Sequence, residues 1–76
     1  MKEFVEYVVK RLVDKPEEVR VNAIDGENTI VLELQVAQRD MGKVLGRQGQ
    51  NVRALRVILT AAAAKKGKRA ALEIIE

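Results

Sequence analysis

The chain has 76 residues, of which 47% are hydrophobic and 33% are charged, and this size and composition predict a single folded domain over residues 1–76. The sequence contains neither cysteine nor histidine, which excludes disulfides, thiol nucleophiles, imidazole bases and the common zinc sites. No apolar run is long enough for a membrane span, and Met1-Lys2-Glu3 does not open a signal peptide, so we expect a cytoplasmic protein.

The net charge of +3 is distributed unevenly along the chain. Residues 39–69 carry nine basic side chains and one acidic side chain, whereas residues 1–18, 19–38 and 70–76 are each net acidic. A field of this kind attracts a polyanion such as a nucleic acid. The competing interpretation is an ordinary solvated basic face, which many soluble domains have.

Residues 3–14 are predicted to form an amphipathic helix that ends before Pro16. We expect Phe4 in the hydrophobic core and Tyr7 at its edge, and we assign neither aromatic ring a base-stacking role. The helical spacing is carried by Phe4, Val5, Val8, Val9, Leu12 and Val13.

Two stretches of alternating apolar and polar residues, 18–24 and 29–36, flank the turn sequence Asp25-Gly26-Glu27-Asn28. This pattern predicts an antiparallel hairpin with one buried face. Asp25 and Glu27 are interpreted as solvated turn residues, because two acidic residues without a third ligand do not make a metal site.

Residues 40–52 are the most distinctive stretch. Asp40 is a candidate N-cap for a short helix over residues 41–45, and Gly46 to Gly49 are predicted to form a tight turn. A second helix follows from about Gln50, and its free N–H groups and positive dipole suit a phosphate. Arg47 adds a mobile positive charge, so the stretch predicts a clamp for a sugar–phosphate backbone. The alternative is a helix–turn–helix connection without a ligand.

The second helix is predicted to run to Lys65, followed by Gly67 in a left-handed conformation and a final strand over residues 70–75. The strand follows a helical crossover, so we expect it to lie parallel to residues 29–36. The predicted fold is α+β in the order α-β-β-α-α-β, with three helices on one face of a three-stranded mixed sheet. The expected core stripe of the second helix is Val52, Leu55, Leu59, Ala62 and Ala63, and a neighbouring polar stripe is Arg53, Arg56 and Thr60.

Gly46-Arg47-Gln48-Gly49 resembles the GXXG signature of KH domains, and the longer run from Asp40 to Gly49 resembles the KhpA family of small bacterial single-KH RNA-binding proteins. The predicted order of elements resembles the type II KH fold. The resemblance implies a single-stranded RNA-binding module without catalytic activity, cofactor or metal, acting as an RNA chaperone or post-transcriptional regulator. Whether single-stranded DNA also binds stays open.

By the same resemblance, the glycine loop would hold phosphates, three apolar residues around it would form a floor for bases, and the last strand from about Arg69 to Leu72 would form the opposite wall. The turn over residues 65–68 corresponds to the variable loop of the family and is short, so few contacts are expected there. The candidate RNA-binding residues are Lys43, Val44, Leu45, Gly46, Arg47, Gln48, Gly49, Val52, Arg53, Arg56, Lys68 and Arg69.

Other functions fit the sequence less well. A P-loop needs Gly-Lys followed by Ser or Thr, and a sheet reader of the RRM type needs exposed aromatic residues on its strands; the sequence supplies neither. The main alternative is a structural or protein-interaction domain without specific RNA binding.

The second helix also predicts self-association, because it is apolar on more than one side. We expect a homodimer, or a heterodimer with a second KH-containing protein of the KhpB type, which the family resemblance implies. The apolar strip outside the expected core stripe of this helix consists of Ala54, Val57, Ile58 and Ala61. Alternatively, this strip forms only the flank of a wide core stripe.

Overall fold

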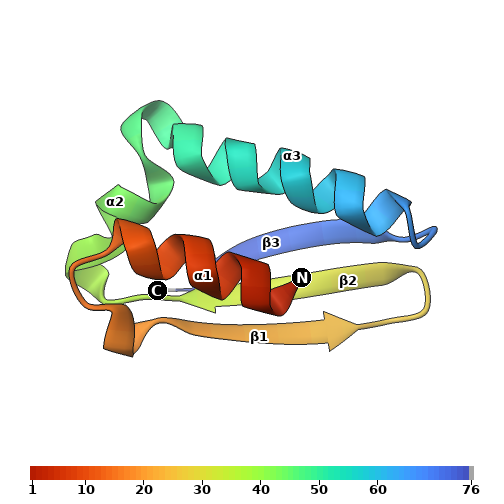
Figure 1. The fold of residues 1–76 in the computed structure, drawn as a ribbon, viewed down its shortest axis with the longest axis horizontal. Coiled ribbons are helices and arrows are strands. Elements are labelled where there is room, and N and C mark those ends of the chain that lie inside the picture. Colours follow the sequence, from red (N-terminus) through yellow and green to blue (C-terminus); the bar gives the residue numbers. More distant parts are fainter. Residues whose placement is uncertain (76) are drawn as a thin grey trace.

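The computed structural model describes residues 1–75 and confirms the predicted order of helices and strands (Figure 1). Within these residues, no helix has both the length and the hydropathy needed to cross a membrane. The elements are α1 Lys2–Leu12, β1 Arg20–Asp25, β2 Thr29–Gln35, α2 Met41–Leu45, α3 Gln50–Ala64 and β3 Arg69–Ile75, with short 3-10 turns at Pro16–Glu18, Gln38–Asp40 and Arg47–Gly49.

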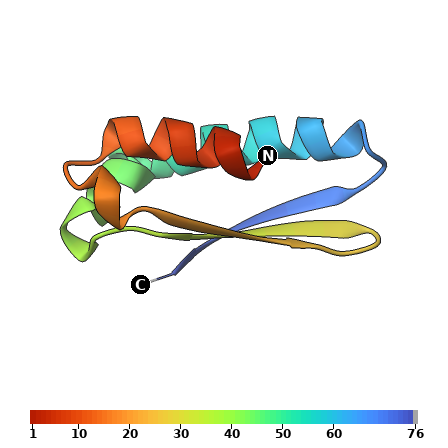
Figure 2. The same cartoon turned by 60° about the horizontal axis from the view of Figure 1, so that its bottom comes forward.

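The three strands form one mixed sheet in the order β1-β2-β3. β1 pairs antiparallel with β2, and β2 pairs parallel with β3, so that Leu32 lies opposite Leu72. The helical crossover over α2 and α3 therefore makes the parallel connection that the sequence predicts. All three helices cover the same face of the sheet, and the opposite face is open (Figure 2).

The core lies between the helices and the covered face of the sheet. α1 contributes Val5 and Val9, both fully buried, and α2 contributes Val44. The predicted stripe of α3 faces this core, although Ala62 is only half-buried. The buried apolar residues of α3 and of the sheet are Val21, Ile30, Leu32, Leu34, Val52, Leu55, Leu59, Ala63 and Leu72.

The prediction for Phe4 was wrong. α1 turns Val5 and Val9 toward the sheet, and the side chain of Phe4, which precedes them on the helix, is 40% exposed. Tyr7 is exposed as well, and the guanidinium of Arg11 lies 4.3 Å from the centroid of its ring. α1 also ends at Leu12, two residues before the predicted end. The core stripe of α1 is thus narrower than the periodicity of its apolar residues indicates.

Candidate nucleic-acid interface

Two features favour glycine at position 46, the first glycine of the loop: its backbone conformation and the lack of room for a side chain. Gly46 ends α2, with its N–H donating to the carbonyl of Gly42 at 2.9 Å, and it has φ 75° and ψ 176°, a region that residues with a Cβ avoid. A Cβ at this position would lie 2.6 Å from Cγ of Asn51. Packing of Asn51 against Gly46 therefore depends on the absence of a side chain there.

Asn51 joins the two helices that flank the loop. Its Nδ2 donates to the carbonyl of Lys43 at 3.0 Å, which satisfies one of the last carbonyls of α2. Asn51 was not among the functional residues predicted from the sequence. The signal was present, because asparagine near a helix start commonly bonds nearby backbone groups, but its acceptor lies across a turn whose shape the sequence does not define.

The tip of the loop turns the chain into α3 through two left-handed residues. Gln48 has φ 56° and ψ 30°, and Gly49 has φ 74° and ψ 17°. A Cβ at Gly49 would meet only Nη1 of Arg53, at 4.0 Å, so this guanidinium lies beside the second glycine. Arg47 and Gln48 are exposed. The loop thus offers open backbone at the start of α3, with Arg47 and Arg53 next to it.

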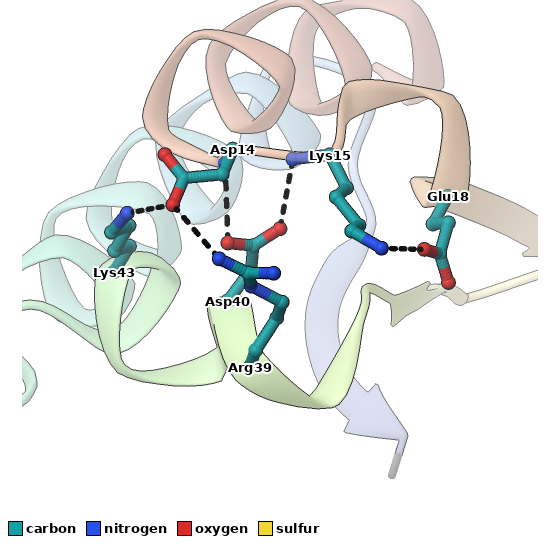
Figure 3. A network of polar contacts seen from close by, with 6 residues as sticks. All are labelled: Asp14, Lys15, Glu18, Arg39, Asp40 and Lys43. Atoms are coloured by element: carbon teal, nitrogen blue, oxygen red, sulfur yellow. Dashed lines mark hydrogen bonds and ion pairs between the residues drawn. The ribbon is translucent and has the colours of Figure 1, made fainter.

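Asp40 positions α2 in a different way from the one predicted. The residue does precede α2, but its side chain makes no capping hydrogen bond. It is fully buried, and its two carboxylate oxygens accept hydrogen bonds from the backbone N–H groups of Asp14 at 3.1 Å and Lys15 at 3.0 Å (Figure 3). Asp40 therefore occupies the predicted N-cap position, but its carboxylate faces the connection after α1 instead of the first turn of α2.

Two of the predicted basic site residues are paired with carboxylates. Lys43 donates to Asp14, and this hydrogen bond and the lysine charge, with a smaller contribution from Arg39, hold the pKa of Asp14 below 3.8 (Figure 3). Lys68 donates to Asp25 at 2.6 Å, and this hydrogen bond and charge likewise hold the pKa of Asp25 below 3.8. The first pair connects α2 with the segment that follows α1, and the second connects the end of β1 with the residue before β3.

A groove of about 250 Å³ lies between α3 and β3. Nη2 of Arg56 donates to the backbone carbonyl of Leu72 at 3.1 Å and so bridges the two elements. The strand predicted as the opposite wall does line this groove, although Arg69, by strand alternation, lies on the open face of the sheet. The lining residues are Arg56, Leu59, Thr60, Ala70, Ala71 and Leu72.

The three apolar residues predicted as a floor for bases lie at different depths. Val44 has no exposed surface and Val52 is also buried, so both support the loop from below. Leu45 is 37% exposed and presents apolar surface beside the loop. The structure therefore gathers Leu45, Arg47 and Arg53 around the glycine loop and places Arg56 farther along α3.

Comparisons with known proteins agree with the observed fold. A family model described as KhpA/KhpB, KH domain, matches residues 2–74. A protein of Clostridium perfringens named RNA-binding protein KhpA is 53% identical over 99% of this chain and 100% of its own length. Proteins of the same name from Aquifex aeolicus and Borreliella burgdorferi are 53% and 50% identical, over 100% and 97% of this chain and 96% and 90% of their own lengths. No solved structure matches the chain at a significant level. The match to the family model over nearly all of its residues shows that the chain belongs to the KhpA/KhpB family of KH-domain proteins.

Proposed function

We propose that this chain binds single-stranded RNA, with the glycine loop on the sugar–phosphate backbone and the α3–β3 groove on the bases. RNA binding follows from the family to which the chain belongs, since relatives of the chain bear the name RNA-binding protein KhpA. KH domains hold about four nucleotides against this loop. In a cell, the chain would act through this binding as an RNA chaperone or as a post-transcriptional regulator.

The observation that carries the proposal is the open backbone of the glycine loop beside two arginines. Within residues 1–75, neither Arg47 nor Arg53 forms an ion pair, whereas Lys43 and Lys68 each contact a carboxylate. An arginine without a carboxylate partner is available for a phosphate oxygen, and the N-terminus of α3 adds favourable partial charge. We therefore assign the main phosphate contacts to Arg47 and Arg53, and secondary contacts to the two lysines.

The test uses Arg47→Asp and a matched control, Lys2→Asp, which changes the net charge equally at an exposed position at the start of α1. Arg47→Asp should weaken binding of a labelled eight-nucleotide RNA at least about tenfold, since a carboxylate then faces the phosphates, and Lys2→Asp should bind nearly as the wild type does. In fluorescence anisotropy over a salt series, Arg47→Ala should reduce the slope of log K against log salt by about 0.7, the contribution of one phosphate contact on a single strand.

Equal loss of affinity in Arg47→Asp and Lys2→Asp would contradict the assignment and point to a diffuse basic surface. Duplex RNA should bind more weakly than the single strand, and a DNA strand of the same sequence reports the contribution of the 2′-hydroxyl groups. If folded wild-type protein bound no single-stranded RNA, the alternative of a structural or protein-interaction domain would stand.

We also propose that the chain pairs with a second copy or with a KH protein of the KhpB type through α3. The strip predicted from the sequence is exposed along its length, with Val57 69% and Ile58 48% exposed. A groove between α1 and α3 extends this apolar surface onto α1, where its lining includes Phe4, Val8 and Leu12. Pairing would place two RNA sites in one particle and raise the affinity for long RNAs without a new contact.

A further inference from the structure

Asp14 lies between two basic side chains, in the segment that joins α1 to the turn at Pro16–Glu18 (Figure 3). Its Oδ2 atom accepts a hydrogen bond from Nζ of Lys43 and lies 4.0 Å from Nη2 of Arg39. The side chains of Asp14 and Lys43 are each about half exposed, so a ligand can reach both of them. The ion pair is therefore a surface contact that a second anion can disrupt.

Lys43 is close to the loop proposed for the RNA backbone. It lies three residues before Gly46, about 4.5 Å along the axis of α2. Its carbonyl accepts the hydrogen bond from Asn51 at the start of α3, which fixes its backbone between the two helices. Its side chain is a flexible stem with a compact charge, which can turn from one anion to another. A phosphate next to the loop and the carboxylate of Asp14 therefore compete for the same ammonium group.

The anchor at Asp40 does not use the side chain of Asp14. It uses the backbone N–H of Asp14, which donates to Asp40 at 3.1 Å. Within residues 1–75, the polar contacts of the Asp14 carboxylate are those with the two basic side chains. An exposed ion pair contributes little to stability, because both charges are well solvated without each other. A substitution of this side chain can thus test binding while the fold is retained.

We propose that Asp14 limits the affinity of the chain for RNA by holding Lys43, so that a phosphate must displace a carboxylate before this lysine contributes to binding. The carboxylate takes the place of a phosphate oxygen while no RNA is bound. Binding then exchanges one ion pair for another, and the gain from Lys43 is small. A weaker contact mainly speeds dissociation, so Asp14 promotes release of the RNA. The inference rests on the proposed RNA binding and concerns the control of its strength.

Asp14→Asn removes the charge and keeps the size of the side chain and the backbone N–H that Asp40 binds. At low salt, this variant should bind labelled r(U)8 about two- to fivefold more tightly than the wild type, because Lys43 becomes free for a phosphate. Its slope of log K against log salt should steepen by about 0.7, the contribution of one further contact on a single strand. Fluorescence anisotropy over a salt series measures both quantities. Asp14→Ser, which also lacks the charge, should give the same result.

Glu17→Gln is the matched control, since it removes the same charge from an exposed residue three positions farther along the chain. It should change the affinity only slightly and leave the slope unchanged. Lys43→Met tests the route of the effect. Asp14→Asn combined with Lys43→Met should bind as Lys43→Met alone does, because no ammonium group is left to be released.

Equal gains in affinity from Asp14→Asn and Glu17→Gln would overturn the inference, since net charge alone would then explain the gain. A gain from Asp14→Asn that persists in combination with Lys43→Met would also overturn it, because the effect would not pass through Lys43. The same holds if the affinity of Asp14→Asn is unchanged while the wild type binds r(U)8, and the proposed function then still stands. Absence of binding by folded wild-type protein would refute the proposed function itself.

Discussion

Gly46 and Gly49 are both glycines with positive φ, but the chain requires them to different degrees. At Gly46 the backbone conformation is one that residues with a Cβ avoid, and Asn51 fills the space where a Cβ would lie. At Gly49 the conformation is the ordinary left-handed one, and a Cβ would meet only the end of Arg53. The first glycine therefore maintains the fold of the loop, and the second mainly keeps its surface open.

This difference predicts unequal effects of the same substitution. Gly46→Ala should lower the free energy of unfolding by about 2–3 kcal/mol, since backbone strain adds to the clash with Asn51. Gly49→Ala should lower it by about 1 kcal/mol, the usual cost of a left-handed residue with a Cβ. Urea unfolding followed by circular dichroism measures both values. Equal losses would mean that Asn51 moves aside freely and that its contact with Gly46 constrains nothing.

The sequence predicts the position of the glycine loop well, but it predicts the hydrogen-bond partners of several side chains poorly. The spacing of Gly46 and Gly49 between two apolar helices is visible without a structure. The acceptor of Arg56 and the donors to Asp40 are not visible, because each is a backbone group far away in the sequence. Such contacts follow only from the way in which the elements pack.

At the scale of the elements, α2 is held in place by the connection that follows α1. The buried carboxylate of Asp40 accepts two backbone hydrogen bonds from this connection, and Lys43 reaches Asp14 on its surface. α2 has five residues, too few for a helix that is stable alone. The direction of the glycine loop therefore depends on the anchor at Asp40 as much as on the helix itself.

The surface ion pairs predict how stability changes with pH. The folded pKa of Asp14 and that of Asp25 both lie below 3.8, so each pair stabilises the fold fully above that value. This stabilisation is lost as the pH falls through the folded pKa, because the protonated carboxyl no longer attracts its lysine. NMR titration should show Asp14 protonating below pH 3.8 in the wild type and closer to 3.8 in Lys43→Met. Identical titration curves in the two proteins would contradict the role of Lys43.

The helices and strands themselves were predictable because their periodic patterns are strong. Phe4 shows where prediction from periodicity fails. Its place in the helical pattern predicted a core position, but the residue only borders the core. A short helix such as α1 has room for few residues against the sheet. Which of its apolar positions remain outside depends on the rotation of α1 against β1 and α2, two elements that it contacts.

The whole molecule has distinct surfaces that separate its proposed contacts. The α3–β3 groove with Arg56 and Thr60 lies on one side of α3, and Ala54 and Ile58 of the exposed strip lie on another, beside α1. The groove proposed for the bases and this part of the strip therefore use different sides of the helix. The amphipathic pattern of α3 predicted both surfaces, but it did not reveal that the apolar one continues onto α1.

Ala61→Asp tests the proposed pairing at an exposed residue of the strip that lies more than two helical turns from Arg53. We expect a folded monomer in sedimentation, with affinity for a single short RNA little changed and weaker binding to long RNAs, because a carboxylate opposes burial of the strip. Glu3→Asp, on exposed surface away from α3, is the control and should sediment as the wild type does. Wild-type protein that stays monomeric at high micromolar concentration would rule out the homodimer and leave the heterodimer to be tested with a KhpB-type protein.

The parallel pairing of β2 with β3 has a consequence for synthesis on the ribosome. Thr29 pairs with Arg69, so this contact closes a long loop, and β3 emerges after all the other elements. Until then, a nascent chain can form α1 and the hairpin, but one edge of β2 is unpaired and open to strands of other chains. The groove proposed for the bases does not exist at that stage. Competence to bind RNA should therefore arise late and abruptly, when the final strand docks.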